Sequence, residues 1–107
     1  GYTSTDRFIR ATYLRHQLRC SHNEDENLMN CFKVLESVSI PQGAVIDANK
    51  IHYTQYQLVM ESKERSYYIK PYFSNQIFKI KLTEDLLSKN EMTFLPINHE
   101  LKITSIQ

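Results

Sequence analysis

The chain has 107 residues, enough for one domain and too few for two independent hydrophobic cores. Thirteen Lys and Arg side chains against twelve Asp and Glu leave a formal charge of +1, and this near-balance argues against a nucleic-acid or polybasic membrane partner. With 41% hydrophobic and 23% charged residues, and no apolar run of the roughly 18 residues that cross a bilayer, the composition excludes disordered and membrane-spanning chains.

The first expected element is a helix over residues 7–19, with a capping signal just before it. Thr3 and Asp6 have the spacing of a capping box, in which two side chains satisfy backbone N–H groups of the first turn. The apolar side chains recur at steps of three and four residues, which is typical of an amphipathic helix. They are Ala11, Leu14 and Leu18, with Phe8 and Ile9 beside them. The opposite face is basic, so residues 1–19 carry a local charge of +3.

Arg7 lies in the first turn of this expected helix, where the helix dipole disfavours a cation. A fixed cation there, next to Asp6 in the sequence, requires a partner. A buried anion or a reactive group is one explanation. An ordinary exposed side chain is the other, and spacing alone does not decide between them.

A second helix is expected to begin after a cap at residues 21–23 and to end near Ser39. The acids at positions 24–26 suit the positive end of a helix dipole. The helix should stop because Ile40 precedes Pro41, and a residue before proline disfavours helical backbone. Its apolar side chains are again three and four residues apart: Leu28, Cys31, Phe32, Leu35 and Val38.

The two cysteines and four histidines form no recognisable site. Cys20 and Cys31 are eleven residues apart and neither belongs to a Cys-x-x-Cys pair, which argues against a zinc or thioredoxin-like site. We expect Cys31 to be a small core residue of the second helix, and Cys20 to be a thiol without a role in the turn between the helices. The histidines lack metal-ligand spacing: they are His16, His22, His52 and His99. We therefore expect no metal ion and no cofactor.

From Ile51 onward the hydrophobic period changes from about 3.6 residues to about 2, which is typical of strands. Three strands joined by two polar turns are expected, with Pro71 at a bulge or an edge position of the second strand. The strands are expected at residues 55–60, 66–73 and 76–82, and the turns at residues 62–65 and 74–75. A helical turn (84–87) and weak strands (93–95 and 101–106) follow. Two helices before an antiparallel meander predict an α+β fold.

Four segments of the chain, in this order and spacing, resemble motifs of one enzyme family. They are GYTSTDRFIRA (residues 1–11), FKVLESVSIPQG (32–43), YTQY (53–56) and YYIKPYFSNQI (67–77). The first is similar to a family segment that contains Ser-Arg-Phe-x-Arg-x-Ala, and the last to a Tyr-Tyr-Tyr-x-Thr-Tyr-x-Asn-Asn-Gln-Ile hairpin. The chain thereby resembles the choloylglycine hydrolase family, which contains bile salt hydrolases and penicillin V acylases.

The resemblance implies an N-terminal-nucleophile (Ntn) hydrolase with an αββα sandwich, which cleaves linear, non-peptide amide C–N bonds. The nucleophile of the family is an N-terminal Cys whose own α-amino group serves as the base. By motif, the catalytic-site Arg of the family corresponds to Arg7, which precedes Phe8. The Cys, its Asp partner and the oxyanion Asn of the family have no counterpart here. The usual Ser before the Arg is Asp6 in this chain, so we expect an ion pair between Asp6 and Arg7 to alter the reach of the guanidinium.

We therefore expect residues 1–107 to form a single C-terminal segment of a choloylglycine hydrolase-like domain, inactive alone. Its expected partners are the missing N-terminal portion, a small-molecule amide substrate and further copies of itself in a homo-oligomer, but neither nucleic acid nor membrane. A second class of function stays open: a free-standing α+β interaction module without catalytic activity, whose sheet edge recruits a partner strand. A nucleic-acid binder that uses the Arg-rich first helix is a weaker alternative.

Overall fold

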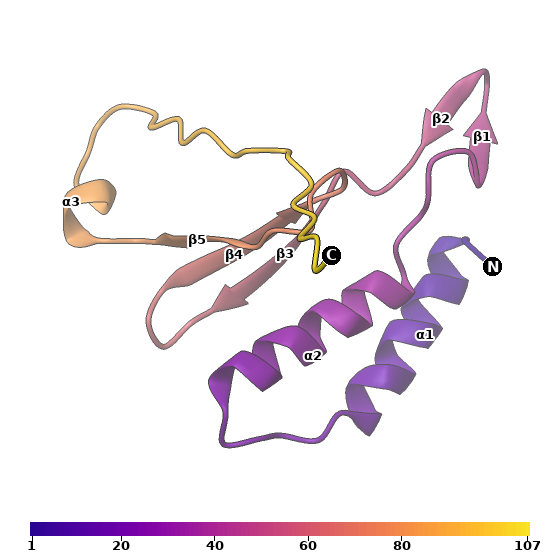
Figure 1. The fold of residues 1–107 in the computed structure, drawn as a ribbon, viewed down its shortest axis with the longest axis horizontal. Helices are drawn as coiled ribbons and strands as arrows, with labels where there is room; N and C mark the ends of the chain where they lie inside the picture. The colour runs from indigo at the N-terminus through magenta and orange to yellow at the C-terminus, as the bar shows by residue number, and fades with distance from the viewer. The chain divides into compact units, whose positions relative to one another are not determined.

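The computed structural model describes all 107 residues, which divide into two units, residues 1–55 and 56–107. The first unit holds two helices and a two-stranded sheet: α1 (Ser4–Gln17), α2 (Glu24–Ser37), β1 (Val45–Asp47) and β2 (Lys50–His52). The second holds an antiparallel sheet in the order β3-β4-β5 and a helical turn: β3 (Tyr56–Glu61), β4 (Ser66–Pro71), β5 (Phe78–Lys81) and α3 (Glu84–Leu87) (Figure 1). Helices followed by antiparallel strands confirm the expected α+β class. None of these helices combines the length and the apolar sequence needed to cross a bilayer.

α1 has the N-cap that the sequence predicts, and it begins directly after that cap at Ser4, earlier than the expected start at residue 7. Thr3 is the N-cap, and its side-chain oxygen accepts a hydrogen bond from the backbone N–H of Asp6 at 3.1 Å. Hydrogen bonding to Thr3 in turn lowers the pKa of the Asp6 carboxyl below its ordinary value of 3.8. α1 ends at Gln17, earlier than the sequence predicts, because Leu18 already has extended backbone.

Thr3→Ala is expected to lower the free energy of unfolding by about 1 kcal/mol, because an N–H of the first turn loses its acceptor. Thr5→Ala removes the same atoms from the same turn without breaking a capping bond, so urea denaturation of both variants isolates the cap. The carboxyl of Asp6, the other member of the capping box, makes the free energy of unfolding depend on pH. Because folding lowers the pKa of Asp6, its stabilisation is present above the ordinary value of 3.8 and is lost as the pH falls through the lowered pKa. Equal losses of unfolding free energy in Thr3→Ala and Thr5→Ala would contradict the role of Thr3 as the cap.

α2 is capped by Asn23, whose side-chain oxygen accepts hydrogen bonds from the N–H groups of Asp25 (2.9 Å) and Glu26 (3.2 Å). Phe32 is 3% exposed and is the one buried side chain of α2. Cys31 is exposed, so the expectation that it belongs to the core is wrong. Successive helical residues are rotated by about 100°, and the burial of Phe32 therefore leaves its neighbour Cys31 to one side.

The segment after α2 is closed by a turn and by Thr54. The N–H of Ala44 donates to the carbonyl of Pro41 at 3.2 Å, and Gly43 has a φ of 92°, the positive value that a type II turn requires at its third residue. Thr54 then binds Ile40 twice. Its N–H donates to the Ile40 carbonyl at 3.0 Å, and its hydroxyl accepts from the Ile40 N–H at 2.8 Å.

The hairpin of β1 and β2 is not among the elements that the sequence predicts. Ile46 and Ile51 are paired across it, and its turn residues Ala48 and Asn49 both have positive φ, 48° and 64°. Two positive φ values are typical of the tight type I′ turn, which is usually signalled by Asn-Gly or Asp-Gly. Ala48 rarely adopts this conformation, so the sequence carries no clear turn signal here.

The sheet of the second unit has the strand order that the sequence predicts. Residues 62–65 form the turn between β3 and β4, and the carboxylate of Glu61 accepts hydrogen bonds from the N–H groups of Lys63 (3.0 Å) and Glu64 (2.6 Å). Residues paired directly across strands share a face, and one face is apolar. Its members are Tyr56, Leu58, Met60, Tyr67, Ile69, Pro71, Phe78 and Ile80. This face is partly open to solvent, with Met60 67% exposed.

Pro71 is the last residue of β4 and lies beyond the β4–β5 pairing, which ends at Ile69. A proline has no N–H, and at this position that loss breaks no hydrogen bond to β5. Pro71 is nevertheless in the central strand and is paired with Tyr56 in an unbroken register, so the prediction of a bulge or an edge position is wrong.

The C-terminal stretch holds no strands, so those predicted at residues 93–95 and 101–106 are wrong. A side chain from the turn after β4 binds the stretch instead. Asn75 donates through Nδ2 to the Lys102 carbonyl at 2.7 Å, and its Oδ1 accepts from the Lys102 N–H at 3.0 Å. One side-chain amide thus supplies both bonds that a neighbouring strand would make, and no strand is needed to hold Lys102.

Candidate functional site

Arg7 is anchored to the end of α2. Its side chain is half-buried, and its Nε donates a hydrogen bond to the Val38 carbonyl at 2.8 Å. Val38 is the C-cap of α2, and the last turn of α2 contains no basic residue. The free carbonyls at a helix C-terminus carry partial negative charge and stabilise a guanidinium. A neighbouring helix end, rather than a buried anion, therefore accounts for the cation near the start of α1.

Arg10 binds the same end of α2 from the next turn of α1. Its Nη1 donates to the Ser37 carbonyl at 3.0 Å, and its Nη2 donates to the Gly1 carbonyl at 3.1 Å. Residues three apart lie on one helix face, so Arg7 and Arg10 reach α2 together. No role for Arg10 is predicted from the sequence. Its spacing from Arg7 and its match to the second Arg of the Ser-Arg-Phe-x-Arg-x-Ala segment are the signals that could have found it.

The outer end of the Arg7 guanidinium keeps unused donors. Nε is fixed, whereas Nη1 and Nη2 make no hydrogen bond in the structure. A guanidinium has five N–H donors, so about four remain for an anion or a polarised group. A guanidinium has donors and no acceptor, so it does not serve as a base. Such a group can favour a thiolate over a thiol or bind an oxyanion, but it needs other residues to complete a catalytic set.

The expected ion pair between Asp6 and Arg7 is wrong. The carboxyl of Asp6 is held by Thr3, which lowers its pKa, and no salt bridge joins it to Arg7. Consecutive helical residues do not face each other, so Asp6 points elsewhere while Arg7 reaches α2. The position of Arg7 is therefore set by Val38 and not by its sequence neighbour.

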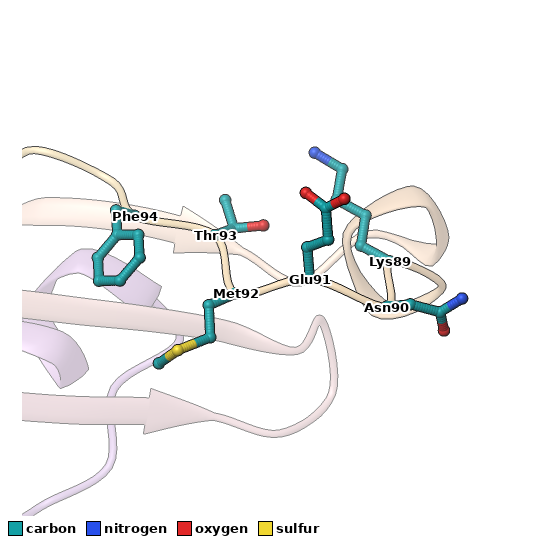
Figure 2. A pocket seen from close by; sticks show the side chains of 6 residues that line it. All are labelled: Lys89, Asn90, Glu91, Met92, Thr93 and Phe94. Carbon is teal, nitrogen blue, oxygen red and sulfur yellow. The ribbon is translucent and has the colours of Figure 1, made fainter.

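The hollow along residues 89–94 offers no chemistry. It has a volume of about 620 Å³ and is lined by six consecutive residues of an irregular segment after α3. Figure 2 shows Lys89 and Glu91 on one side of this segment and Met92 and Phe94 on the other. A binding site normally gathers a few polar groups toward one point. These side chains diverge, so the hollow carries no site.

The remaining candidate residues are dispersed. Cys20 and Cys31 are both exposed, free thiols. No three His, Cys, Asp or Glu side chains gather in an arrangement that could hold a metal ion. Arg7, the residue that the sequence singles out for catalysis, is half-buried and bound to Val38.

Comparison with known proteins gives consistent matches. Residues 1–95 match the model of the linear amide C–N hydrolases, choloylglycine hydrolase family. Over 64 residues, 59% of this chain, the sequence is 34% identical to conjugated bile acid hydrolase of Lactobacillus acidophilus, and the match covers 20% of that protein. Crystal structures of two variants of conjugated bile acid hydrolase from Clostridium perfringens match 100% of this chain, with TM-scores of 0.78 and 0.77 at 24% and 23% identity.

These matches show the fold and how much of it the chain contains. The structural likeness confirms the expected fold class, an α+β part of an Ntn-hydrolase sandwich. The chain spans 33% of each of the two crystallised relatives and 20% of the Lactobacillus protein. Because the family model accounts for residues 1–95 of 107, the chain belongs to the choloylglycine hydrolase family of linear amide C–N hydrolases.

Proposed function

We propose that residues 1–107 are a single C-terminal segment of an Ntn hydrolase that cleaves linear, non-peptide amide C–N bonds. Its substrates are conjugated bile salts, penicillin V or related N-acyl amides. The nucleophile is an N-terminal Cys that lies outside this segment. The observation that supports the proposal is the setting of Arg7: a half-buried guanidinium, fixed at Nε and with its Nη atoms free, within a family-matched segment.

In the proposed reaction Arg7 contributes its positive charge. A cation within about 4–6 Å of a thiol favours its thiolate, which is the attacking form. The α-amino group of the Cys takes the thiol proton, and the thiolate sulfur forms a bond to the amide carbon. The C–N bond then breaks as the leaving amine takes that proton from the α-ammonium group. Water hydrolyses the resulting thioester, releases the carboxylic acid and restores the thiol. Arg7 itself neither gains nor loses a proton in these steps.

The segment alone is proposed to be inactive. An internal cysteine has its nitrogen in a peptide bond, so neither Cys20 nor Cys31 offers a free α-amino group as base. Both thiols are free and exposed. Catalysis therefore needs the missing N-terminal portion.

Exposed apolar side chains on each unit support the proposal that a partner covers this segment. Phe8, Ile9 and Tyr13 of α1 are 71%, 61% and 63% exposed, and Tyr56 and Met60 of β3 are 59% and 67% exposed. We propose that the missing portion of the same protein covers these surfaces. The isolated segment is then expected to self-associate through them, because large exposed apolar patches are rare on monomers. Sedimentation velocity over a range of concentrations checks this, and a strictly monomeric species at high concentration would count against it.

The experiment that tests the proposed function is turnover by the whole protein that carries this segment. Incubation with a conjugated bile salt and with penicillin V is expected to release amine and carboxylic acid in equal amounts, at one or both substrates. Residues 1–107 alone should release neither. A folded whole protein that cleaves no linear amide would overturn the proposal and favour the interaction module, whose β3 has one unpaired edge.

A further inference from the structure

We propose that Arg10 is a positioning residue for Arg7. It acts by fixing the end of α2 to which the Arg7 guanidinium is bound. The inference rests on the proposed function, because it takes Arg7 as the catalytic cation, and it assigns Arg10 a role in kcat without contact to the substrate.

The two arginines bind consecutive carbonyls. Arg7 Nε donates to the Val38 carbonyl at 2.8 Å, and Arg10 Nη1 donates to the Ser37 carbonyl at 3.0 Å. Both side chains are half-buried. Consecutive peptide units are joined by one rotatable Cα, so a movement at one carbonyl displaces the other. Arg10 therefore restrains the acceptor on which the orientation of Arg7 depends.

Arg10 also ties this helix end to the chain before α1. Its Nη2 donates to the Gly1 carbonyl at 3.1 Å, from the same rigid plane that binds Ser37. One guanidinium thus joins Gly1, which precedes α1, to α1 itself and to the end of α2. A lysine carries the charge but lacks the planar fork, and it replaces only part of this contact.

α2 has no other cation to hold its C-terminal carbonyls. Its last turn contains no basic residue, and its Ser37 hydroxyl is already bound to the Val34 carbonyl at 2.6 Å. Without Arg10, the last carbonyls of α2 would keep Arg7 as their one cationic partner. The guanidinium of Arg7 would then follow a loosened helix end. Misplacement of a catalytic group by about 1 Å can cost up to about 100-fold in rate.

A double-mutant cycle in the whole protein tests the inference. Arg7→Met is expected to lower kcat by about 100-fold, and Arg10→Met by about tenfold with KM nearly unchanged. If Arg10 acts through Arg7, the double variant is no slower than Arg7→Met alone. Once the Arg7 guanidinium has been removed, losing the residue that positions it has no further effect on kcat. Arg10→Lys should recover part of the loss. Arg15→Met, an exposed change on the same helix, is the matched control and should keep the parental kcat.

The outcomes separate the two proposals. Additive losses in the double variant, or an unchanged kcat in Arg10→Met, would overturn the role of Arg10 while the loss in Arg7→Met leaves the proposed function standing. An unchanged kcat in Arg7→Met would overturn the proposed function itself. If Arg10→Met does not fold, Arg10→Lys with and without Arg7→Met repeats the same cycle, and additivity there also overturns the inference.

Discussion

Replacing Arg7 by Met in the whole protein is expected to lower kcat for amide hydrolysis by about 100-fold, the usual effect of removing one preorganised charge donor. The change removes the cation that favours the thiolate, and it leaves binding of the rest of the substrate in place. The loss should therefore appear in kcat more than in KM. Steady-state kinetics with a conjugated bile salt or penicillin V measure it.

Two further variants make the Arg7 experiment specific. Arg7→Lys keeps the charge but not the donor at Nε that binds Val38, so an intermediate loss of about tenfold is expected. Arg15→Met removes a guanidinium from an exposed site on α1 and should leave kcat unchanged. Unchanged turnover of every amide by Arg7→Met would contradict the assigned role.

Phe32→Ala is expected to have the largest effect on stability, a loss of about 3–5 kcal/mol in the free energy of unfolding. Phe32 is 3% exposed on α2, where it is the one fully buried hydrophobic side chain. Truncation removes its buried apolar surface and leaves a cavity that a helix cannot fully close. Urea denaturation of the whole protein measures the loss.

The matched control for Phe32 is a change that keeps most of its volume. Phe32→Leu is expected to cost under about 1.5 kcal/mol, because volume-conserving apolar replacements are tolerated best. A loss below about 1 kcal/mol in Phe32→Ala would mean that Phe32 is not the centre of packing in the first unit.

Elements with strong local signals are predictable from the sequence. The capping residue Thr3 starts α1 as its spacing with Asp6 predicts, because a capping box needs only neighbouring side chains. The turn at residues 62–65 forms as expected for a similar reason, with Glu61 binding the backbone of the turn that follows it. Local hydrogen bonds decide both elements.

Elements that depend on distant contacts or unusual backbone are not predictable in this way. The turn of the first hairpin places Ala48 at a φ of 48°, which residue type alone disfavours. Lys102 is held by the side chain of Asn75 instead of a strand, and no period in the sequence indicates such a bond. Cys31 fits the apolar spacing of α2 and is nevertheless exposed, because burial also depends on what covers the helix.

The candidate site also has a part that the sequence predicts and a part that depends on distant contacts. Arg7 can be found from a motif, since its type and neighbours are written in the sequence. Its anchor on Val38, and the contact of Arg10 with Ser37, join residues 31 and 27 positions apart. Contacts of this kind arise only when α1 and α2 pack together, so the sequence alone gives no role to Arg10.

The most direct test is a crystal structure of the whole protein. We predict that Nε of Arg7 stays on the Val38 carbonyl and that its free Nη atoms lie within about 4–6 Å of the sulfur of an N-terminal Cys. An Arg7 side chain that faces bulk solvent, with no thiol in that range, would contradict the central claim.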